Sequence, residues 1–379
     1  MLPLEGITVI ALEQAVAVPF ATRQLADLGA RVIKVERPEV GDFARNYDTT
    51  VQGLSSHFVW TNRSKESITI DMKSTKGKQV LKQLIAKADV LIQNLKPGAL
   101  ERMGFIPENL LEKYPELIIC NLSGYGKTGP YADKKAYDLL VQCEAGLVSI
   151  TGDNNTPSKT GISIGDIAGG MYAYTGILTA LLTRQKTGEG TILEISLLEA
   201  LGEWMGYPAY YASYGGEEPA RTGASHSTIY PYGPFECGDG KTIFIGLQNE
   251  REWKQFCEEV LKQPDLARDS RFNTNFNRSA NRHILKKIIE EKLNSLTSDL
   301  AIARIEKANI ANARLNTMKD FFEHPQLKAR NRWTQVDTPK GKINALKPPV
   351  TNKNFEAVMD PVPDIGEHTT KILKELGID

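Results

Sequence analysis

Short apolar runs alternate with amphipathic segments through the first third of the chain. Residues 6–12 and 30–36 are apolar runs of strand length, and residues 20–28 between them have helical spacing that stops at Gly29. Further strands are predicted over residues 67–72, 90–93 and 117–122, with a helix over residues 76–88. Strand–helix alternation is typical of parallel strands joined by crossover helices, so this part is predicted to be α/β.

The pattern changes after the middle of the chain. The uncharged run 167–183 is too short for the ~20 apolar residues of a membrane span, so it is predicted to be a buried helix that starts at about Asp166. A strand is predicted over residues 191–196. From about Ser213, Gly, Pro, Tyr and Ser become frequent, and a strand over residues 242–246 follows.

These changes predict two domains. The large α/β domain covers residues 1–212 and is completed by residues 325–379, which include a strand over 333–337 and a helix near 367–376. The small α+β domain covers residues 213–324, with charged helical segments over residues 251–322.

Composition excludes several classes of function. Lys plus Arg and Asp plus Glu both number 46, so no net charge favours nucleic acid or a membrane, and any anion site is local. The four cysteines have no CxxC spacing and the five histidines form no ligand pair, so neither a disulfide framework nor a metal site is predicted. The N-terminus does not resemble a secretion signal, and a reducing, cytoplasmic setting fits best.

A glycine motif follows the strand predicted over residues 117–122. Gly124, Gly126 and Gly129 match GxGxxG, which in a dinucleotide-binding fold opens a helix whose N-terminus faces the pyrophosphate. Here residues 130–135 have no apolar helical face, and the motif comes after several strand–helix units. A glycine-rich loop is therefore predicted, and not a dinucleotide site.

Asp166 stands between glycines at the start of the small-residue helix, in Gly165-Asp-Ile-Ala-Gly169. An Asp in front of an apolar helix is usually an N-cap, and the residue pattern alone favours that role. The same position suits a nucleophile or base, because a helix N-terminus keeps a carboxylate ionised. Backbone N–H groups near Gly165 and Gly169 are candidate oxyanion donors in that case.

Basic residues follow several of the predicted strands. They are Arg37, Lys73, Arg102 and Lys135. Ligands of open parallel sheets bind at the carboxyl ends of the strands, so together these cations suggest a phosphate-rich ligand, although each alone is typical of a solvated surface. His226 lies in a loop rich in small residues, where it either lines a site or has a structural role.

Blocks along nearly the whole chain match one known family, and they cover residues 4–10, 28–37, 62–67, 88–94, 97–105, 123–130, 137–142, 165–166, 187–190 and 226–240. In these blocks the chain resembles class III coenzyme A transferases, the CaiB/BaiF type that includes formyl-CoA and carnitine-CoA transferases. The resemblance implies a Rossmann-like large domain, a small domain and a homodimer of two subunits linked like rings. It also implies acyl-CoA and a small carboxylic acid as substrates, with no permanently bound cofactor.

The resemblance also assigns residues. The family's nucleophilic aspartate falls on Asp166, which would form an aspartyl-CoA thioester during transfer. Its coenzyme A contacts fall on Val16, Arg37, Ile70, Lys73, Asn94, Leu95, Arg102, Met103 and Lys135. This set includes all four basic residues that the strand pattern singles out.

The same family contains α-methylacyl-CoA racemases, which pair the aspartate with a histidine. That histidine falls on Tyr137 in this chain, so transferase is the favoured activity and racemase the alternative. Residues 13–17 and 56–62 resemble members that act on small dicarboxylates with succinyl-CoA, whereas the glycine run of the oxalate-specific branch is missing. Tyr137, His57 and His226 are the candidate pocket residues, and His57 or Arg45 is the candidate partner of a distal carboxylate.

Overall fold

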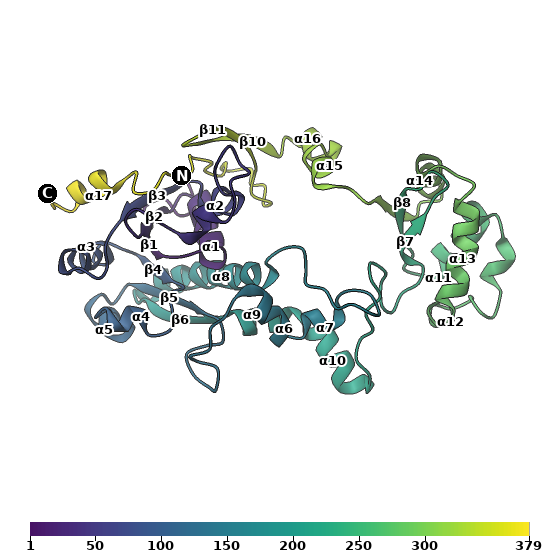
Figure 1. Cartoon of the computed structure of the whole chain (residues 1–379), viewed down its shortest axis with the longest axis horizontal. Coiled ribbons are helices and arrows are strands. Elements are labelled where there is room, and N and C mark those ends of the chain that lie inside the picture. Colours follow the sequence, from purple (N-terminus) through teal and green to yellow (C-terminus); the bar gives the residue numbers. More distant parts are fainter. Residues whose placement is uncertain (379) are drawn as a thin grey trace. The chain divides into compact units, whose positions relative to one another are not determined.

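A computed structural model describes residues 1–378, and it contains a six-stranded parallel sheet with the order β3-β2-β1-β4-β5-β6 (Figure 1). The strands are β1 (Thr8–Leu12), β2 (Arg31–Glu36), β3 (Lys65–Thr69), β4 (Val90–Gln93), β5 (Ile118–Ser123) and β6 (Thr191–Ser196). All five neighbouring pairs are parallel. The α/β class with a parallel sheet, predicted from the sequence, is confirmed.

The chain divides into two compact units. The larger unit comprises residues 1–147, 160–209 and 326–379, and the smaller unit comprises residues 148–159 and 210–325. The sheet belongs entirely to the larger unit.

Alternating side chains of the sheet lie in two separate apolar cores. Val9 and Ala11 of β1 lie in one core, whereas Ile10 and Leu12 lie in the other. Because successive strand residues point to opposite faces, both faces must be covered by other elements. One face packs against α1 (Ala17–Asp27), α6 (Asp138–Glu144), α8 (Ile164–Thr187) and α9 (Leu197–Trp204). The other packs against α3 (Thr75–Ile85), α4 (Ala99–Arg102), α5 (Pro107–Lys113) and α17 (Thr369–Glu375).

Helices α1 and α8 lie side by side on the first face (Figure 1). Gly170 makes this close approach possible, since a Cβ atom there would lie 2.5 Å from the carbonyl oxygen of Ala17. Helix α1 follows β1, and α8 lies in the connection from β5 to the parallel strand β6, so both begin at the carboxyl edge of the sheet. The contact therefore fixes two helix N-termini near each other.

The substitution Gly170→Ala is expected to destabilise the protein by about 2 kcal/mol, because the new methyl group meets backbone that cannot move aside. Gly176→Ala in the same helix is the matched control. Its Cβ would meet only Leu193 Cδ1, at 3.6 Å, so the better helix propensity of alanine should stabilise the protein by about 0.5–1 kcal/mol. Urea unfolding measures both values, and equal effects of the two substitutions would contradict this account.

The smaller unit is built around a three-stranded antiparallel sheet. Its strands are β7 (Tyr232–Glu236), β8 (Thr242–Gly246) and β9 (Ala311–Arg314), in that order. Its helical segments are α11 (Glu250–Gln255), η2 (Phe256–Leu261), η3 (Pro264–Ala267), α12 (Asn275–Ala280), α13 (Arg282–Leu293), α14 (Ser298–Lys307) and α15 (Met318–Phe322). Trp253, Phe256 and Phe272 are fully buried in a core of its own.

Segments distant in sequence complete the larger unit. The C-terminal segment lies along the outer edge of β3, where the Ser67 N–H donates to His368 Nδ1 at 3.2 Å and the Thr69 N–H donates to Thr369 Oγ1 at 3.0 Å. Ile372 of α17 is buried in the second core.

The hairpin of β10 (Trp333–Thr338) and β11 (Gly341–Leu346) packs through Val336 against α2 (Ser56–Asn62). The remaining elements of the chain are η1 (Phe43–Asn46), α7 (Leu147–Ile150), α10 (Gly206–Gly215) and α16 (Pro325–Ala329).

Several predictions from the sequence need correction. The segment 251–322 is not entirely helical, because β9 pairs with β8 inside it. Helix α8 is not fully buried, since Tyr172 and Leu182 are exposed. The strand predicted over residues 333–337 is β10, and its partner β11 was not predicted from the sequence.

The glycine motif lies where the sequence predicts a loop. Residues 124–137, with the glycine motif, contain no helix, which confirms the predicted loop. All four cysteines are free. Within residues 1–378 no helix has both the length and the apolar character needed to cross a membrane, and no three His, Cys, Asp or Glu side chains are arranged to hold a metal ion.

Candidate active site

The strand order places a ligand-binding crevice at a defined point of the larger unit. The order β3-β2-β1-β4-β5-β6 reverses direction between β1 and β4, and ligands of such sheets bind outside the carboxyl ends of the strands at this switch point. The loops after β1 and β4 therefore meet there. The Asn94 side chain joins them, because its Oδ1 accepts from the Gln14 N–H and its Nδ2 donates to the Gln14 carbonyl oxygen, each at 2.9 Å.

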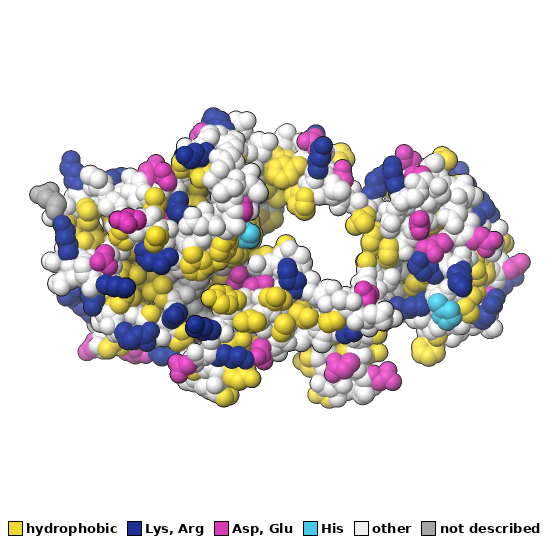
Figure 2. Space-filling view, in the orientation of Figure 1, with side chains coloured by type: hydrophobic (Ala, Val, Ile, Leu, Met, Phe, Trp, Pro, Cys, Tyr) yellow, Lys and Arg dark blue, Asp and Glu magenta, His cyan; other side chains and the backbone are white. Residues whose placement is uncertain are grey.

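The four predicted phosphate-binding cations all follow carboxyl ends of strands. Arg37 comes directly after β2, Lys73 after β3, Arg102 ends α4 after β4, and Lys135 lies in the loop after β5. Their side chains are exposed, and among the described residues none of the four forms an ion pair. Lys and Arg side chains are frequent over the part of the larger unit that contains α3, α4 and α5 (Figure 2).

The uncharged residues predicted to contact coenzyme A differ in how far their side chains are exposed. Val16 and Ile70 are buried, with 4% and 5% of their surfaces exposed, whereas Leu95 and Met103 are half-buried beside the second core. The Asn94 amide is occupied by both bonds to Gln14. Any contact of Asn94 with a ligand must therefore use its backbone, the second N–H of its amide or the remaining lone pair of its oxygen.

Asp166 is the third residue of α8 and does not cap it, so the N-cap interpretation of the sequence was wrong. Ser163 holds the N-cap position without a side-chain bond. The cap comes instead from Asp138, whose Oδ1 accepts from the Gly165 N–H at 2.8 Å and from the Asp166 N–H at 3.3 Å. Among residues 1–378 the Asp166 carboxylate has no hydrogen-bond partner, which leaves both of its oxygens for a ligand.

Asp138 also sets the electrostatics of Asp166. Withdrawal from water and the negative charge of Asp138 raise the pKa of Asp166 to about 7. Asp138 is itself held by Gln142, which is fully buried and whose Nε2 donates to Asp138 Oδ2 at 2.7 Å. Asp166 is therefore poised between its acid form and its nucleophilic form at neutral pH.

The Gly165 N–H is not a free oxyanion donor in this structure, because its bond to Asp138 occupies it. Gly169 lies within α8, where backbone N–H groups bond to the preceding turn. A carbonyl oxygen of the substrate must be stabilised by other groups.

Tyr47 lies near the Asp166 carboxyl group, and Tyr137 and His57 lie near Tyr47. Burial and the nearby charges of Asp42, Asp166 and Tyr137 raise the pKa of Tyr47 to about 12, so the Tyr47 hydroxyl stays protonated. Tyr137 is 68% exposed at the start of α6. His57 contacts Tyr47 edge to face, with 5.3 Å between ring centroids. The structure thus groups Tyr47, Tyr137 and His57 with Asp166, and Tyr47 was not predicted from the sequence.

Two other candidates are engaged elsewhere. Arg45 makes a two-pronged ion pair with buried Glu36, at 2.7 and 2.8 Å, and is not free to hold a distal carboxylate as the sequence suggested. His226 lies in the smaller unit, where its Nδ1 accepts from the Thr228 and Ile229 N–H groups and its ring stacks on Tyr232 at 5.2 Å. Its Nδ1 therefore stabilises a turn, and only Nε2 is open to a ligand.

The substitution Asp166→Asn is expected to stabilise the ligand-free protein at pH 8 more than at pH 5. The folded pKa of about 7 lies above the ordinary value of 3.8, so the stability that the protonated carboxyl contributes is lost as the pH rises through about 7. Asparagine cannot ionise, and the gain over the wild type should grow by about 2–3 kcal/mol between the two pH values.

Urea unfolding at both pH values measures this gain. Asp320→Asn is the control, because hydrogen bonds from Thr317 lower the pKa of that exposed carboxyl, and its substitution should destabilise the protein similarly at pH 5 and pH 8. A gain for Asp166→Asn that is the same at both pH values would refute the raised pKa.

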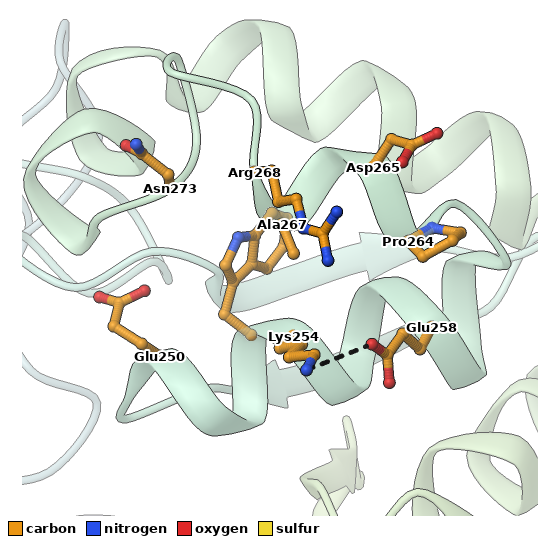
Figure 3. Close-up of a pocket in the computed structure, with 9 residues that line it drawn as sticks. Glu250, Lys254, Glu258, Pro264, Asp265, Ala267, Arg268 and Asn273 are labelled. Carbon is orange, nitrogen blue, oxygen red and sulfur yellow. Dashed lines mark ion pairs between the residues drawn. The ribbon is translucent and has the colours of Figure 1, made fainter.

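A surface pocket of about 470 Å³ lies in the smaller unit, between α11, η2 and η3 (Figure 3). Its lining is of mixed charge, with the Lys254–Glu258 ion pair at 3.9 Å on one side and Arg268 and Asp265 on the other. None of the candidate site residues lines this pocket. The crevice at the carboxyl edge of the large sheet remains the candidate active site.

Comparison with known proteins identifies the family. The model of CoA-transferase family III matches residues 4–369. The chain belongs to CoA-transferase family III. Among curated relatives, the human succinyl-CoA:glutarate CoA-transferase is 35% identical over 378 residues, which cover 99% of this chain and 86% of the relative. The succinyl-CoA:mesaconate CoA-transferase of Haloarcula hispanica is 30% identical, over 99% of this chain and 96% of the relative.

A solved structure supports the same assignment to CoA-transferase family III. A CAIB/BAIF family protein from Brucella suis superposes with a TM-score of 0.87 at 34% identity, and 99% of each chain is covered. The family resemblance predicted from the sequence is therefore confirmed, as is the enzyme class.

Proposed function

We propose that this protein transfers coenzyme A from succinyl-CoA to a small dicarboxylic acid, with Asp166 as the covalent nucleophile. The observation that supports it most is the Asp166 carboxylate itself, which has no partner within the described residues and stands at the carboxyl edge of the sheet. The names of the relatives that act on succinyl-CoA with glutarate or mesaconate support this substrate class.

In the proposed first half-reaction, an Asp166 oxygen attacks the thioester carbonyl of succinyl-CoA. The carbon–sulfur bond breaks, the coenzyme A thiolate leaves, and a mixed anhydride of succinate and Asp166 forms. The thiolate then attacks the aspartyl carbonyl carbon. Succinate leaves with the bridging oxygen, and an aspartyl-CoA thioester remains.

The second half-reaction runs these steps in reverse with the acceptor. The acceptor carboxylate attacks the aspartyl carbonyl, the thiolate leaves, and a second mixed anhydride forms. The thiolate attacks the acceptor acyl carbon, which gives the new acyl-CoA and frees the Asp166 carboxylate. No proton is gained or lost overall, so Asp166 must be ionised at the start of each cycle.

The groups around Asp166 suit these steps. Asp138 is fixed by Gln142 and holds the first turn of α8, so the nucleophile has a defined position before substrate arrives. The desolvation that raises the pKa of Asp166 also increases the reactivity of the ionised form and limits hydrolysis of the anhydrides. The Tyr47 hydroxyl, protonated at all moderate pH values, is a candidate hydrogen-bond donor to a substrate oxygen.

Coenzyme A is proposed to bind along the carboxyl edge of the larger unit. Arg37 and Lys73 would neutralise phosphate groups on one side of the switch point, and Arg102 and Lys135 on the other. The rest of coenzyme A would contact the backbone at Val16, Ile70, Asn94, Leu95 and Met103. His57 and Tyr137, beside Tyr47, are proposed to contact the acceptor acid, and His226 is proposed as a further pocket residue.

An interlocked homodimer is part of the same proposal. Large apolar side chains are exposed on α8, α9 and α10 of the single chain, among them Leu182, Trp204, Tyr210 and Tyr214. Exposed aromatic and other large apolar side chains are enriched at subunit interfaces. Sedimentation equilibrium tests this part of the proposal independently of activity.

The decisive experiment is to incubate the protein with succinyl-CoA and then treat it with hydroxylamine or borohydride. Mass spectrometry of the wild type should locate a modification on Asp166, and Asp166→Ala should lack it. A panel of acceptors that includes glutarate, mesaconate and oxalate then defines the second substrate by the acyl-CoA formed. Absence of an adduct together with α-proton exchange in deuterated water would favour a racemase instead.

A further inference from the structure

A network of charged side chains is buried where the loops after β1 and β2 pack on the sheet, and Asp166 is not a member of it. Lys34 of β2 lies between two carboxylates, with its Nζ 3.1 Å from Glu13 Oε1 and 2.8 Å from Asp42 Oδ2. Lys65 of β3 adds a second cation, 2.7 Å from Glu13 Oε1. The side chains of Glu13, Lys34 and Lys65 and the whole of Asp42 are inaccessible to solvent. Even when buried charges are paired, their attraction often does not offset the loss of hydration, so the sequence maintains this arrangement at a cost in stability.

Asp42 extends this network to the backbone of the crevice. Both of its oxygens accept from the Ala15 N–H, at 3.0 and 3.2 Å, and Oδ1 also accepts from the Ala44 N–H at 2.9 Å. With Lys34, three donors therefore converge on one carboxylate. An amide in its place would turn an NH2 group toward at least one of these donors, so the site requires a carboxylate.

The bond from Ala15 holds an unusual backbone conformation. Ala15 has φ +62°, in the left-handed region that residues with a Cβ rarely adopt. The turn lies between Gln14, which Asn94 clamps to the loop after β4, and Val16, which precedes the first residue of α1. This turn therefore determines where the N-terminus of α1 points at the switch point.

The same carboxylate positions the segment that leads to Tyr47. Asp42 is the N-cap residue of η1, and the Phe43 N–H donates to Gln14 Oε1 at 3.2 Å. The loop after β1 and the loop after β2 are thereby joined at two points. Tyr47, beside Asp166, follows η1 directly.

We propose that Asp42 is a positioning residue for acyl-CoA: held by Lys34, it sets the left-handed turn at Ala15 and so shapes the β1–α1 loop against which coenzyme A binds. The inference rests on the proposed function for the identity of the ligand. Asp42 is fully buried and touches no substrate, so its effect passes through the Ala15 and Ala44 backbone.

The chain offers a matched control in Asp27. This carboxylate is also buried, 2% exposed, and is paired with two cations, Arg23 at 2.9 Å and Arg63 at 2.7 Å. It is the last residue of α1, at the opposite end of the helix from Val16. Asp42→Asn and Asp27→Asn should both lower the free energy of unfolding, but only the first should change the crevice.

The test measures the dissociation constant of coenzyme A by titration calorimetry and, separately, KM and kcat with succinyl-CoA. Asp42→Asn is expected to raise both the dissociation constant and the KM for succinyl-CoA by about ten-fold, with kcat changed by less than about three-fold. Asp27→Asn should leave the dissociation constant and KM within about two-fold of the wild type. Lys34→Gln retains a donor to Asp42 without the charge, and it should raise the dissociation constant by about three-fold.

Each outcome bears on the inference. An unchanged dissociation constant in folded Asp42→Asn, or equal changes in Asp42→Asn and Asp27→Asn, overturns it. If Asp42→Asn does not fold, Lys34→Gln decides, and an unchanged dissociation constant there also overturns it. A wild type that binds coenzyme A without transferring it would refute the proposed function and leave the binding comparison valid. A wild type that does not bind coenzyme A would refute both.

Discussion

Replacing Asp166 by alanine is expected to lower kcat for coenzyme A transfer by at least about 10³-fold, because the covalent route loses its nucleophile. Coenzyme A should still bind within about three-fold of the wild-type affinity, since the proposed phosphate contacts lie on other residues. Steady-state assays with succinyl-CoA and glutarate, together with calorimetric titration of coenzyme A, measure the two quantities separately.

Two comparisons make the Asp166 result specific. Asp166→Asn has nearly the shape of the wild-type side chain and should be as inactive as Asp166→Ala. Asp320→Ala removes an exposed carboxylate of the smaller unit and should retain full activity. Activity of Asp166→Asn above about a tenth of the wild-type level would exclude covalent catalysis by this residue.

Removal of two cations from one side of the switch point should have the second-largest effect. Arg37→Ala combined with Lys73→Ala is expected to raise KM for succinyl-CoA by about 10²-fold, because each substitution removes a charge-assisted hydrogen bond to a phosphate group. The effect should shrink at high ionic strength, since both side chains are exposed and salt screens their charges. Initial rates over a range of succinyl-CoA concentrations, at low and high salt, measure the change.

The matched control removes the same charge from the opposite edge of the same sheet. Lys82 lies in the last turn of α3 and Lys87 follows that helix just before β4, so both lie toward the amino ends of the strands. Lys82→Ala with Lys87→Ala should leave KM within about two-fold of the wild type. A similar rise in both double variants would indicate a general charge effect and not a binding site.

The central strands of the sheet could be predicted from the sequence because they are buried on both faces. Val90–Gln93 agrees with the structure to the residue, since a continuous apolar run between turn signals has few alternatives. Thr191–Ser196 also agrees to the residue, although this edge strand is only partly buried. The strand Ala311–Arg314 was missed, because it is short, mostly exposed and lacks both apolar alternation and aromatic residues. Its pairing with β8 comes from tertiary contacts that periodicity does not record.

The candidate active site could likewise be predicted only in part. Asp166 was identified by the family resemblance, whereas its helix context alone favoured a cap. Its actual cap, Asp138, precedes it by 28 residues, and no local spacing rule connects the two. Tyr47 and the Asp42 network were missed for the same reason, because a pattern along one element does not show which loops the sheet order brings together.

The position of the C-terminal segment along β3 has a consequence for synthesis of the protein. His368 and Thr369 bond to residues of β3 that lie about 300 positions earlier in the chain, and α17 covers the same end of the sheet. A ribosome that has made all six strands has not yet made this segment, so the nascent sheet keeps one edge unpaired until residues 368 and 369 have been synthesised. Exposed strand edges invite pairing with other chains. We therefore expect chains released early, without residues 366–378, to aggregate even though every strand of the large sheet is present.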